Sequence, residues 1–120
     1  MSLLCDAFST NDYICVNTGE AIVSSKNLST NFVNTCTVIA FKYNDKKFMA
    51  HLDAINPNME FIVNQQLNSI DLKKVKKIYV WKGSKCYSNC PSFTLAIKII
   101  KKIGSKNIIY LQSNDDTIKI

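Results

Sequence analysis

The sequence predicts an α+β domain built in layers, because two helical segments are set among short strands that are joined mostly by tight turns. The first observation is a helix over 91–103 that follows a proline and stops at Gly104. Its apolar stripe consists of Phe93, Ala96, Ile97, Ile100 and Ile103. The second observation is a pair of β-prone runs, Cys36–Tyr43 and Lys47–Asp53, that flank a short turn and predict a hairpin.

The first third of the chain is expected to hold a lead-in, a hairpin and a loop. Met1–Asp12 has no apolar period and is expected to be a loosely ordered lead-in to a single domain that spans all 120 residues. Tyr13–Val16 and Glu20–Ser24 are β-prone and lie on either side of an Asn-Thr-Gly turn signal, so they are expected to pair as a hairpin. Lys26–Asn34 is polar and is expected to be a loop.

The central hairpin brings a cysteine and the single histidine of the chain towards each other. If its turn lies at Asn44 and Asp45, His51 lies beside Val38 and two residues from Cys36. A diagonal neighbour at that offset is about 7–8 Å away, which is within reach of side chains, whereas a slip of one residue would turn the ring to the other face. Such a pair is expected to form a thiolate and an imidazolium, the nucleophile that opens an amide or ester carbonyl.

The second half of the chain is expected to continue with a helix, a strand, the helix over 91–103 and two more strands. The first of these helices begins with Asn56 as its cap and Pro57 in its first turn, and it continues towards Asn68. The expected strands are Lys76–Trp81, Asn107–Leu111 and Thr117–Ile120.

Composition argues against several classes of protein. The apolar runs are only a few residues long, well short of the ~18 needed to cross a bilayer, so no membrane partner is expected. Five cysteines, an odd number, in a chain able to build its own core predict free thiols in a reducing compartment, the cytoplasm of its own cell or of a host. Cys86 and Cys90 have a spacing that suits a metal, but with one histidine too few ligands remain, so neither metal nor cofactor is expected.

The net charge of +6 comes from lysines alone, because all fifteen basic residues are lysine and none is arginine. Arginine makes most bidentate contacts to bases and phosphates, so no nucleic-acid partner is expected. The densest cluster of basic residues is Lys73, Lys74, Lys76 and Lys77. We interpret this cluster as a solvated face in preference to a patch for an acidic partner. Composition leaves the oligomeric state open.

A spaced pattern of residues runs through the first half of the chain. Its positions are Val16, Gly19, Glu20, Thr30, Cys36, Tyr43, Asp45 and His51. The pattern resembles that of the CheD-like chemoreceptor glutamine deamidases, in which a cysteine opens an apolar strand and a histidine ends the next one. The Thr35–Cys36 step and the string Ala50–Asp53 also look like the amidases that act on N-terminal asparagine, and the cytotoxic necrotising factor toxins share the Cys/His layout.

The resemblance implies a layered α/β/β sandwich of mostly antiparallel strands and a cysteine amidohydrolase. Its substrate would be a glutamine or asparagine side chain of a protein, deamidated through a thioester. The resemblance implies Cys36 as nucleophile, His51 as base and acid, and Thr30 as the third catalytic residue. The backbone from Thr35 to Thr37, and the Thr37 N–H above all, is expected to hold the oxyanion. The side chain of Thr35 is expected to bind substrate. Asp53 is expected either to shape that pocket or to orient the ring of His51.

Two other functions remain open at this stage. Val33, Asn34 and Thr35 replace the Leu-Gly-Ser that the family has before its cysteine, and the closing Gly-Gly and Arg motif is missing, so a catalytically silent protein-binding module of the same fold is one alternative. The other is a thiol peptidase or transglutaminase that uses the same Cys36 and His51 pair. Each residue also has an ordinary structural role, since a cysteine is often a small buried hydrophobe.

Overall fold

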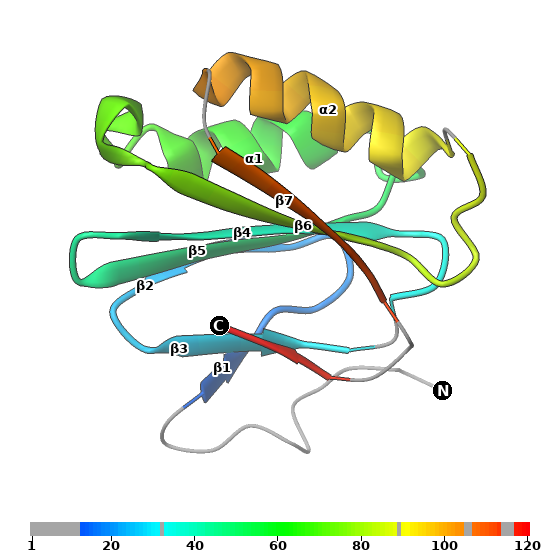
Figure 1. Ribbon diagram of the computed structural model, residues 1–120, viewed down its shortest axis with the longest axis horizontal. Coiled ribbons are helices and arrows are strands. Elements are labelled where there is room, and N and C mark those ends of the chain that lie inside the picture. Colours follow the sequence, from blue (N-terminus) through cyan, green and yellow to red (C-terminus); the bar gives the residue numbers. More distant parts are fainter. Residues whose placement is uncertain (1–12, 32, 89, 105–106, 114–116) are drawn as a thin grey trace.

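Three layers stack on one another in this protein: two helices, a five-stranded sheet and a three-stranded sheet (Figure 1). The computed structural model describes residues 13–31, 33–88, 90–104, 107–113 and 117–120. The expected lead-in over 1–12 lies outside the described residues. Four of the six strand pairings within the described residues are antiparallel. The predicted α+β sandwich of mostly antiparallel strands is therefore confirmed.

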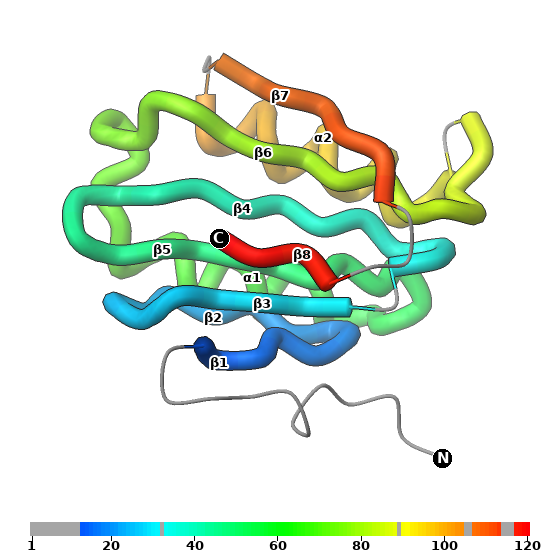
Figure 2. The backbone as a smooth tube through the Cα atoms, turned by 60° about the horizontal axis from the view of Figure 1, so that its bottom comes forward, coloured from blue at the N-terminus to red at the C-terminus, as the bar shows by residue number. Residues whose placement is uncertain are grey.

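The five-stranded sheet is the middle layer and contains the central hairpin. In spatial order its strands are β2 (Ala21–Ser24), β5 (Lys46–Leu52), β4 (Thr37–Tyr43), β6 (Lys77–Lys82) and β7 (Asn107–Gln112), as Figure 2 shows. Val38 lies opposite His51 across β4 and β5, so the predicted register is confirmed. β6 and β7 run parallel because a helix crosses over between them, whereas the other neighbours are antiparallel.

The three-stranded sheet corrects two expectations about the first third of the chain. Its strands are β1 (Tyr13–Cys15), β3 (Asn27–Thr30) and β8 (Ile118–Lys119). β1 and β2 do not form a hairpin, because β1 pairs in parallel with β3 in the other sheet. The expected loop over 26–34 contains β3, in which Leu28 and Thr30 are buried between the sheets. A strand with one apolar and one polar inward side chain has no visible apolar period, which explains why the sequence suggested a loop.

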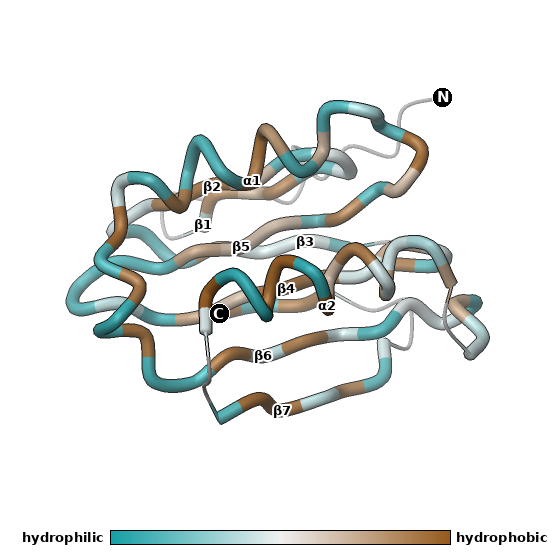
Figure 3. The backbone as a smooth tube through the Cα atoms, turned by 90° about the horizontal axis from the view of Figure 1, so that it is seen from above, coloured by the Kyte–Doolittle hydropathy of each residue, from teal (hydrophilic) through white to brown (hydrophobic). Residues whose placement is uncertain are grey.

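The helices α1 (Met59–Leu67) and α2 (Pro91–Ile103) cover one face of the middle sheet, and a short 3₁₀ helix, η2 (Leu72–Lys74), follows α1. Apolar and polar residues alternate along both helices in Figure 3. The prediction for α2 is confirmed at both ends. α1 begins later than expected, with Asn58 as its cap, because the Asn56 side chain accepts the Asn58 N–H at 2.9 Å and closes a turn before the helix.

The middle sheet separates two clusters of buried residues. The larger one fills the space between this sheet and the helices. The smaller one lies between the two sheets and consists of Val16, Leu28, Val33, Val38, Ala40, Met49 and Ile118, with Cys36 packed against it. Within the described residues, neither helix has the length and apolar character needed to cross a membrane.

The expectation of free thiols is wrong for three of the described cysteines. Cys86 and Cys90 form a disulfide in the loop between β6 and α2, and Cys15 is also disulfide-bonded. An odd number of cysteines requires only one unpaired thiol, and among the described residues that thiol belongs to Cys36. The loop doubles back from the end of β6 to the start of α2, which brings two cysteines four residues apart together.

Candidate active site

His51 is the last residue but one of β5, and its side chain is 1 % exposed. Its backbone is held by the turn that precedes β2. The His51 N–H donates to the Glu20 carbonyl at 2.9 Å, and the Gly19 N–H donates to the His51 carbonyl at 2.9 Å. The Glu20 carboxylate in turn accepts the Asn17 N–H at 2.8 Å, which closes this turn. Gly19 has a φ of 84°, a conformation that favours glycine, so the Gly-Glu pair has a structural role in positioning the histidine.

A single hydroxyl proton decides which nitrogen of His51 is protonated. Thr30 Oγ1 donates to the Val16 carbonyl at 2.6 Å and lies 2.7 Å from His51 Nδ1. Because a hydroxyl has one proton and here it goes to the carbonyl, Nδ1 must supply the hydrogen of the bond to Oγ1. In the neutral ring Nε2 is then the unprotonated nitrogen, which accepts protons.

His51 Nε2 is buried and has no hydrogen-bond partner among the described residues. Leaving a buried polar group unpaired costs about 1–3 kcal/mol, so such groups are rare and call for an explanation. Thr30, which is also 1 % exposed, holds the opposite side of the ring in place. The hydrogen bonds of Thr30 therefore set both the tautomer and the orientation of the His51 ring.

Cys36 lies directly before β4 and packs against the cluster between the sheets. Val38 and Ala40 belong to the same cluster, so Cys36 is on the face of β4 that carries Val38, the strand partner of His51. The thiol and the ring thus occupy diagonal positions on one face, as the sequence predicted. No hydrogen bond joins them, since Nε2 has no partner. Catalytic hydrogen bonds are often long before substrate binds.

The loop after β6 packs closely on the backbone next to Cys36. A Cβ atom at Gly83 would overlap the carbonyl oxygens of Asn34 and Cys36, so only glycine fits there. The Ser84 N–H donates to the Val33 carbonyl at 3.1 Å, and the Lys85 N–H donates to the Asn34 carbonyl at 2.9 Å. The Cys86–Cys90 disulfide then ties this loop to the first turn of α2.

The first turn of α2 holds the same segment from the other side. Ser92 is 1 % exposed, and its Oγ donates to the Thr35 carbonyl at 2.7 Å. Ser92 Oγ also lies 2.9 Å from Thr37 Oγ1, and because its own proton is used, Thr37 donates. Two elements distant in the sequence therefore fix the residues on either side of Cys36.

Burial keeps both the Cys36 thiol and the His51 ring neutral. It raises the pKa of the Cys36 thiol to about 11, and the Asp53 carboxylate adds to this rise. It also lowers the pKa of His51 to about 4, although Asp53 acts in the opposite direction. At pH 7 the pair is a thiol and a neutral imidazole, not the thiolate and imidazolium expected from the sequence. Because Asp53 acts on both groups, its carboxylate lies within electrostatic reach of both.

The two expected substrate-binding residues share one cavity. This open cavity of about 370 Å³ is lined by Thr35, Asp53, Ala54, Ile55, Pro91 and Ser92. Asp53 Oδ1 accepts the Ile55 N–H at 3.0 Å, and no hydrogen bond joins Asp53 to His51 within the described residues. Of the two roles expected for Asp53, this geometry favours shaping the pocket, because Thr30 already holds the ring.

The backbone donor expected at Thr37 faces the wrong way. His51 directs its backbone groups towards Glu20 and Gly19, on the β2 side of β5. The backbone N–H and C=O groups of successive residues in a strand point to opposite sides, so those of Leu52 point towards β4 and its partner Thr37. The Thr37 N–H therefore points towards β5, into the sheet. The N–H groups of Thr35 and Cys36 donate to no backbone carbonyl within the described residues.

Sequence reasoning missed three contributions to the site. The Val16 carbonyl sets the tautomer of His51, and Ser92 and Gly83 hold the segment around Cys36. Gly83 gave a signal as a turn residue after a strand, but a turn does not reveal which backbone it contacts. A carbonyl and a serine at the start of a helix carry no signal of this kind in the sequence.

No protein-family model matches this chain, and no curated protein matches it either. The resemblance to the CheD-like deamidases therefore stays a prediction that rests on the residues named above.

Proposed function

We propose that this chain is a cysteine-dependent amidohydrolase that deamidates glutamine or asparagine side chains of a protein. The observation that carries the proposal is the buried, unpartnered Nε2 of His51. Its opposite nitrogen is bonded to a threonine whose own proton is committed elsewhere, so Nε2 is a proton acceptor. A thiol on the same strand face supplies the proton and the nucleophile.

The mechanism follows from these groups. As Cys36 attacks the carboxamide carbon, its proton passes to His51 Nε2, and the carbonyl oxygen becomes an oxyanion bound by the Thr35 and Cys36 N–H groups. The tetrahedral intermediate collapses to a thioester, and Nε2 returns the proton to the leaving nitrogen, which departs as ammonia. Water, deprotonated by Nε2, then hydrolyses the thioester and releases the carboxylate and the thiol. Thr30 stabilises the imidazolium that forms twice in this cycle.

The neutral state of the Cys36 thiol and the His51 ring determines how the proposed reaction begins. A thiol with a pKa of about 11 is not a nucleophile at pH 7, so attack requires proton transfer to Nε2 in the same step. The same observation supports the second candidate function, a silent module of this fold that binds a protein without chemistry.

A diazoketone analogue of glutamine, placed in a short peptide, distinguishes these candidates. It alkylates a cysteine that attacks a glutamine carbonyl, and the adduct on Cys36 is counted by mass spectrometry. We expect labelling in the native chain and a loss of about 100-fold or more in His51→Gln. Equal labelling of both proteins would reject the amidohydrolase in favour of the silent module.

Two controls accompany this experiment. Thr94→Ala, an exposed change on α2, should leave labelling unchanged, whereas Cys36→Ala should abolish it. With glutamine peptides, a mass increase of about one dalton and release of ammonia indicate deamidation. Cleavage or crosslinking of the same peptides would instead indicate a thiol peptidase or transglutaminase.

The compartment in which the chain acts also belongs to this proposal. The sequence favoured the cytoplasm, of its own cell or of a host. Disulfides at Cys86–Cys90 and at Cys15 are typical of oxidising compartments. We therefore propose that the chain matures in an oxidising compartment, and that a substrate in a host cytosol would be reached only after transfer.

A further inference from the structure

One face of the middle sheet extends beyond the three-stranded sheet. That smaller sheet lies against the β2 and β5 side, and β6 and β7 continue past its edge strand β8 (Figure 2). The rings of Tyr79 and Trp81 stack there with centroids 5.8 Å apart, and Leu111 is 39 % exposed. An open hollow of about 200 Å³ is lined by Lys42, Tyr79, Trp81, Leu111, Lys119 and Ile120.

A row of lysines crosses three strands beside this hollow. Lys42 on β4 lies directly opposite Lys47 on β5. In the register of β4 and β6 Ala40 faces Tyr79, and two residues further on Lys42 is set opposite Lys77. Like charges directly opposite each other destabilise a sheet. None of these three lysines forms an ion pair within the described residues.

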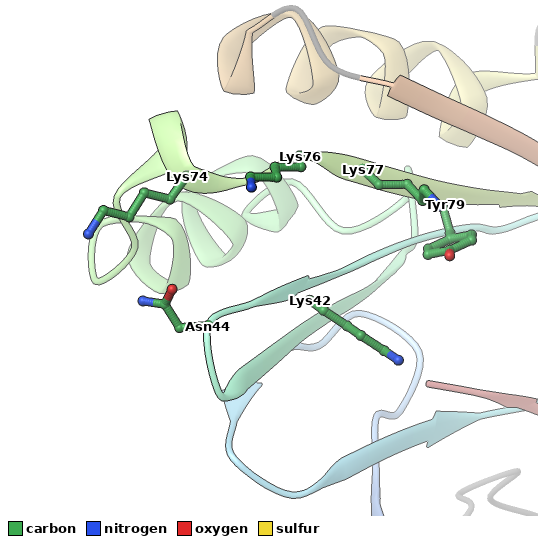
Figure 4. A pocket seen from close by; sticks show the side chains of 6 residues that line it. All are labelled: Lys42, Asn44, Lys74, Lys76, Lys77 and Tyr79. Atoms are coloured by element: carbon green, nitrogen blue, oxygen red, sulfur yellow. The ribbon is translucent and has the colours of Figure 1, made fainter.

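The lysine row borders a second open cavity, of about 420 Å³ (Figure 4). Its lining residues are Lys42, Asn44, Lys74, Lys76, Lys77 and Tyr79. Figure 4 shows Lys74 and Lys76 on the segment that leads into β6 and Lys77 at the start of β6, across from Lys42 and Asn44. No carboxylate among the described residues lines this cavity, and Lys42 and Tyr79 also line the hollow next to it. We call the two together the lysine groove.

We propose that the lysine groove binds an extended acidic segment of a partner protein. Carboxylates of the segment would neutralise the opposed lysines, which removes the repulsion within the sheet. One large apolar side chain of the segment would pack on Trp81 and Leu111, because these side chains and Ile120 give the hollow apolar walls beside Lys42 and Lys119.

Other anionic partners fit the groove less well. Nucleic acids are held best by arginine, and the chain has none. A flat membrane surface does not enter a recess between two sheets. The Lys42 end of the groove lies six positions along the chain from Cys36, roughly 20 Å of strand, whereas Trp81 at its other end pairs with Val38, two residues from Cys36. Binding there does not depend on chemistry at Cys36.

Trp81 allows a direct test, because it is the single tryptophan of the chain and lines the groove. The probe is a short synthetic peptide of glutamate and aspartate with one central phenylalanine, titrated into the full chain while tryptophan emission is recorded. We expect a saturable change that weakens as salt is added. A peptide with alanine in place of phenylalanine should bind less tightly, and this difference should disappear in Leu111→Ser.

A matched pair of double variants separates the groove from net charge. Lys42→Gln with Lys77→Gln should weaken peptide binding roughly fivefold to tenfold. Lys101→Gln with Lys102→Gln, exposed on α2 in the opposite layer, should weaken it less than about twofold. Both variants lower the net charge by the same amount, and circular dichroism checks their folding.

Three results would overturn the proposal. Equal losses in the two double variants would show that net charge alone attracts the peptide. A tighter response of Trp81 to a single-stranded oligonucleotide or to pyrophosphate would assign the groove to phosphates. A tighter response to vesicles of anionic lipid would assign it to a membrane surface.

Discussion

The two ends of the β4–β5 hairpin differ in the burial of their polar side chains and in the partners that these side chains have. At the end with Cys36 and His51, Thr30 and Ser92 are buried, and each makes two hydrogen bonds. At the end with the turn, Lys42 and Lys77 are exposed, Lys47 is half-buried and donates to Asn27 Oδ1, and none of the three has an ion pair within the described residues. The first end leaves His51 Nε2 without a hydrogen-bond partner, and the second leaves opposed positive charges without a carboxylate among the described residues.

The difference between the two ends indicates how each end would recognise a ligand. Groups fixed by burial and hydrogen bonds have one geometry, which suits the positioning that a reaction requires. Exposed lysines are mobile and screened by salt, so they select for charge rather than for shape. Changes at the first end should therefore affect both stability and reactivity, and changes at the second should affect neither strongly.

Gly83→Ala should have the largest effect. The added methyl group overlaps two backbone carbonyls beside Cys36, so we expect the free energy of unfolding to fall by about 3 kcal/mol or more. Gly104→Ala is the matched control, because nothing lies near its Cβ and only the strain of a φ of 106°, about 1 kcal/mol, is added. Urea titration measures both variants, and equal losses would contradict the close packing around Cys36.

Acid should destabilise the chain through His51. The ring binds a proton below pH 6.5 when the chain is unfolded but only below about 4 when it is folded. The unfolded state therefore binds more protons between these values, and the free energy of unfolding falls by about 3 kcal/mol as the pH drops through them. In His51→Gln this part of the pH dependence should be absent. An unchanged slope in that variant would assign the acid sensitivity to other groups.

Removal of the Thr30 hydroxyl should have a smaller effect. Thr30→Val removes the hydrogen bonds of Thr30 Oγ1 with the Val16 carbonyl and with His51 Nδ1, which should cost about 2 kcal/mol in the free energy of unfolding. Thr30→Ser keeps the hydroxyl and should retain both stability and labelling of Cys36 by the diazoketone peptide. If the valine variant were labelled as fast as the serine variant, Thr30 would have no role in positioning the ring.

Substitutions at the lysine end should have the smallest effect on the free energy of unfolding. Lys42→Gln removes repulsion from Lys47, so we expect the free energy of unfolding to rise by at most about 0.5 kcal/mol at low salt and by less at high salt. Thermal melts at two salt concentrations measure this difference. A clear loss of stability would mean that Lys42 has a packing role, and the contrast between the two ends would then be wrong.

Some elements could be predicted because their signal is local. The helix α2 has a proline at its start, an apolar stripe and a glycine after its last residue. The β4–β5 hairpin has a short turn, which fixes its register and with it the opposition of His51 and Val38. β3 could not be predicted, because its burial comes from a second sheet formed with β1 and β8, both distant in the sequence.

The residues of the candidate site likewise divide into those that could be predicted from the sequence and those that could not. Thr30, Cys36 and His51 were identified from their spacing and from a resemblance, and the structure joins the first and last of them by a hydrogen bond. The Thr37 N–H was assigned wrongly, because which way a backbone group points depends on the neighbour with which the strand pairs. The prediction of free thiols from the odd number of cysteines was also wrong, because disulfide pairing depends on which loops come together in the fold.

The sequence by itself determined the layered α+β class and the hairpin that sets Cys36 and His51 on one face, because periods of two and 3.6 residues and short turns act over neighbouring residues. Only the tertiary structure decided which nitrogen of His51 carries the proton, that both groups are neutral, and that lysines from adjacent strands face one another. Protonation and repulsion depend on burial and on the partners within a few ångströms, and folding supplies both from distant parts of the chain.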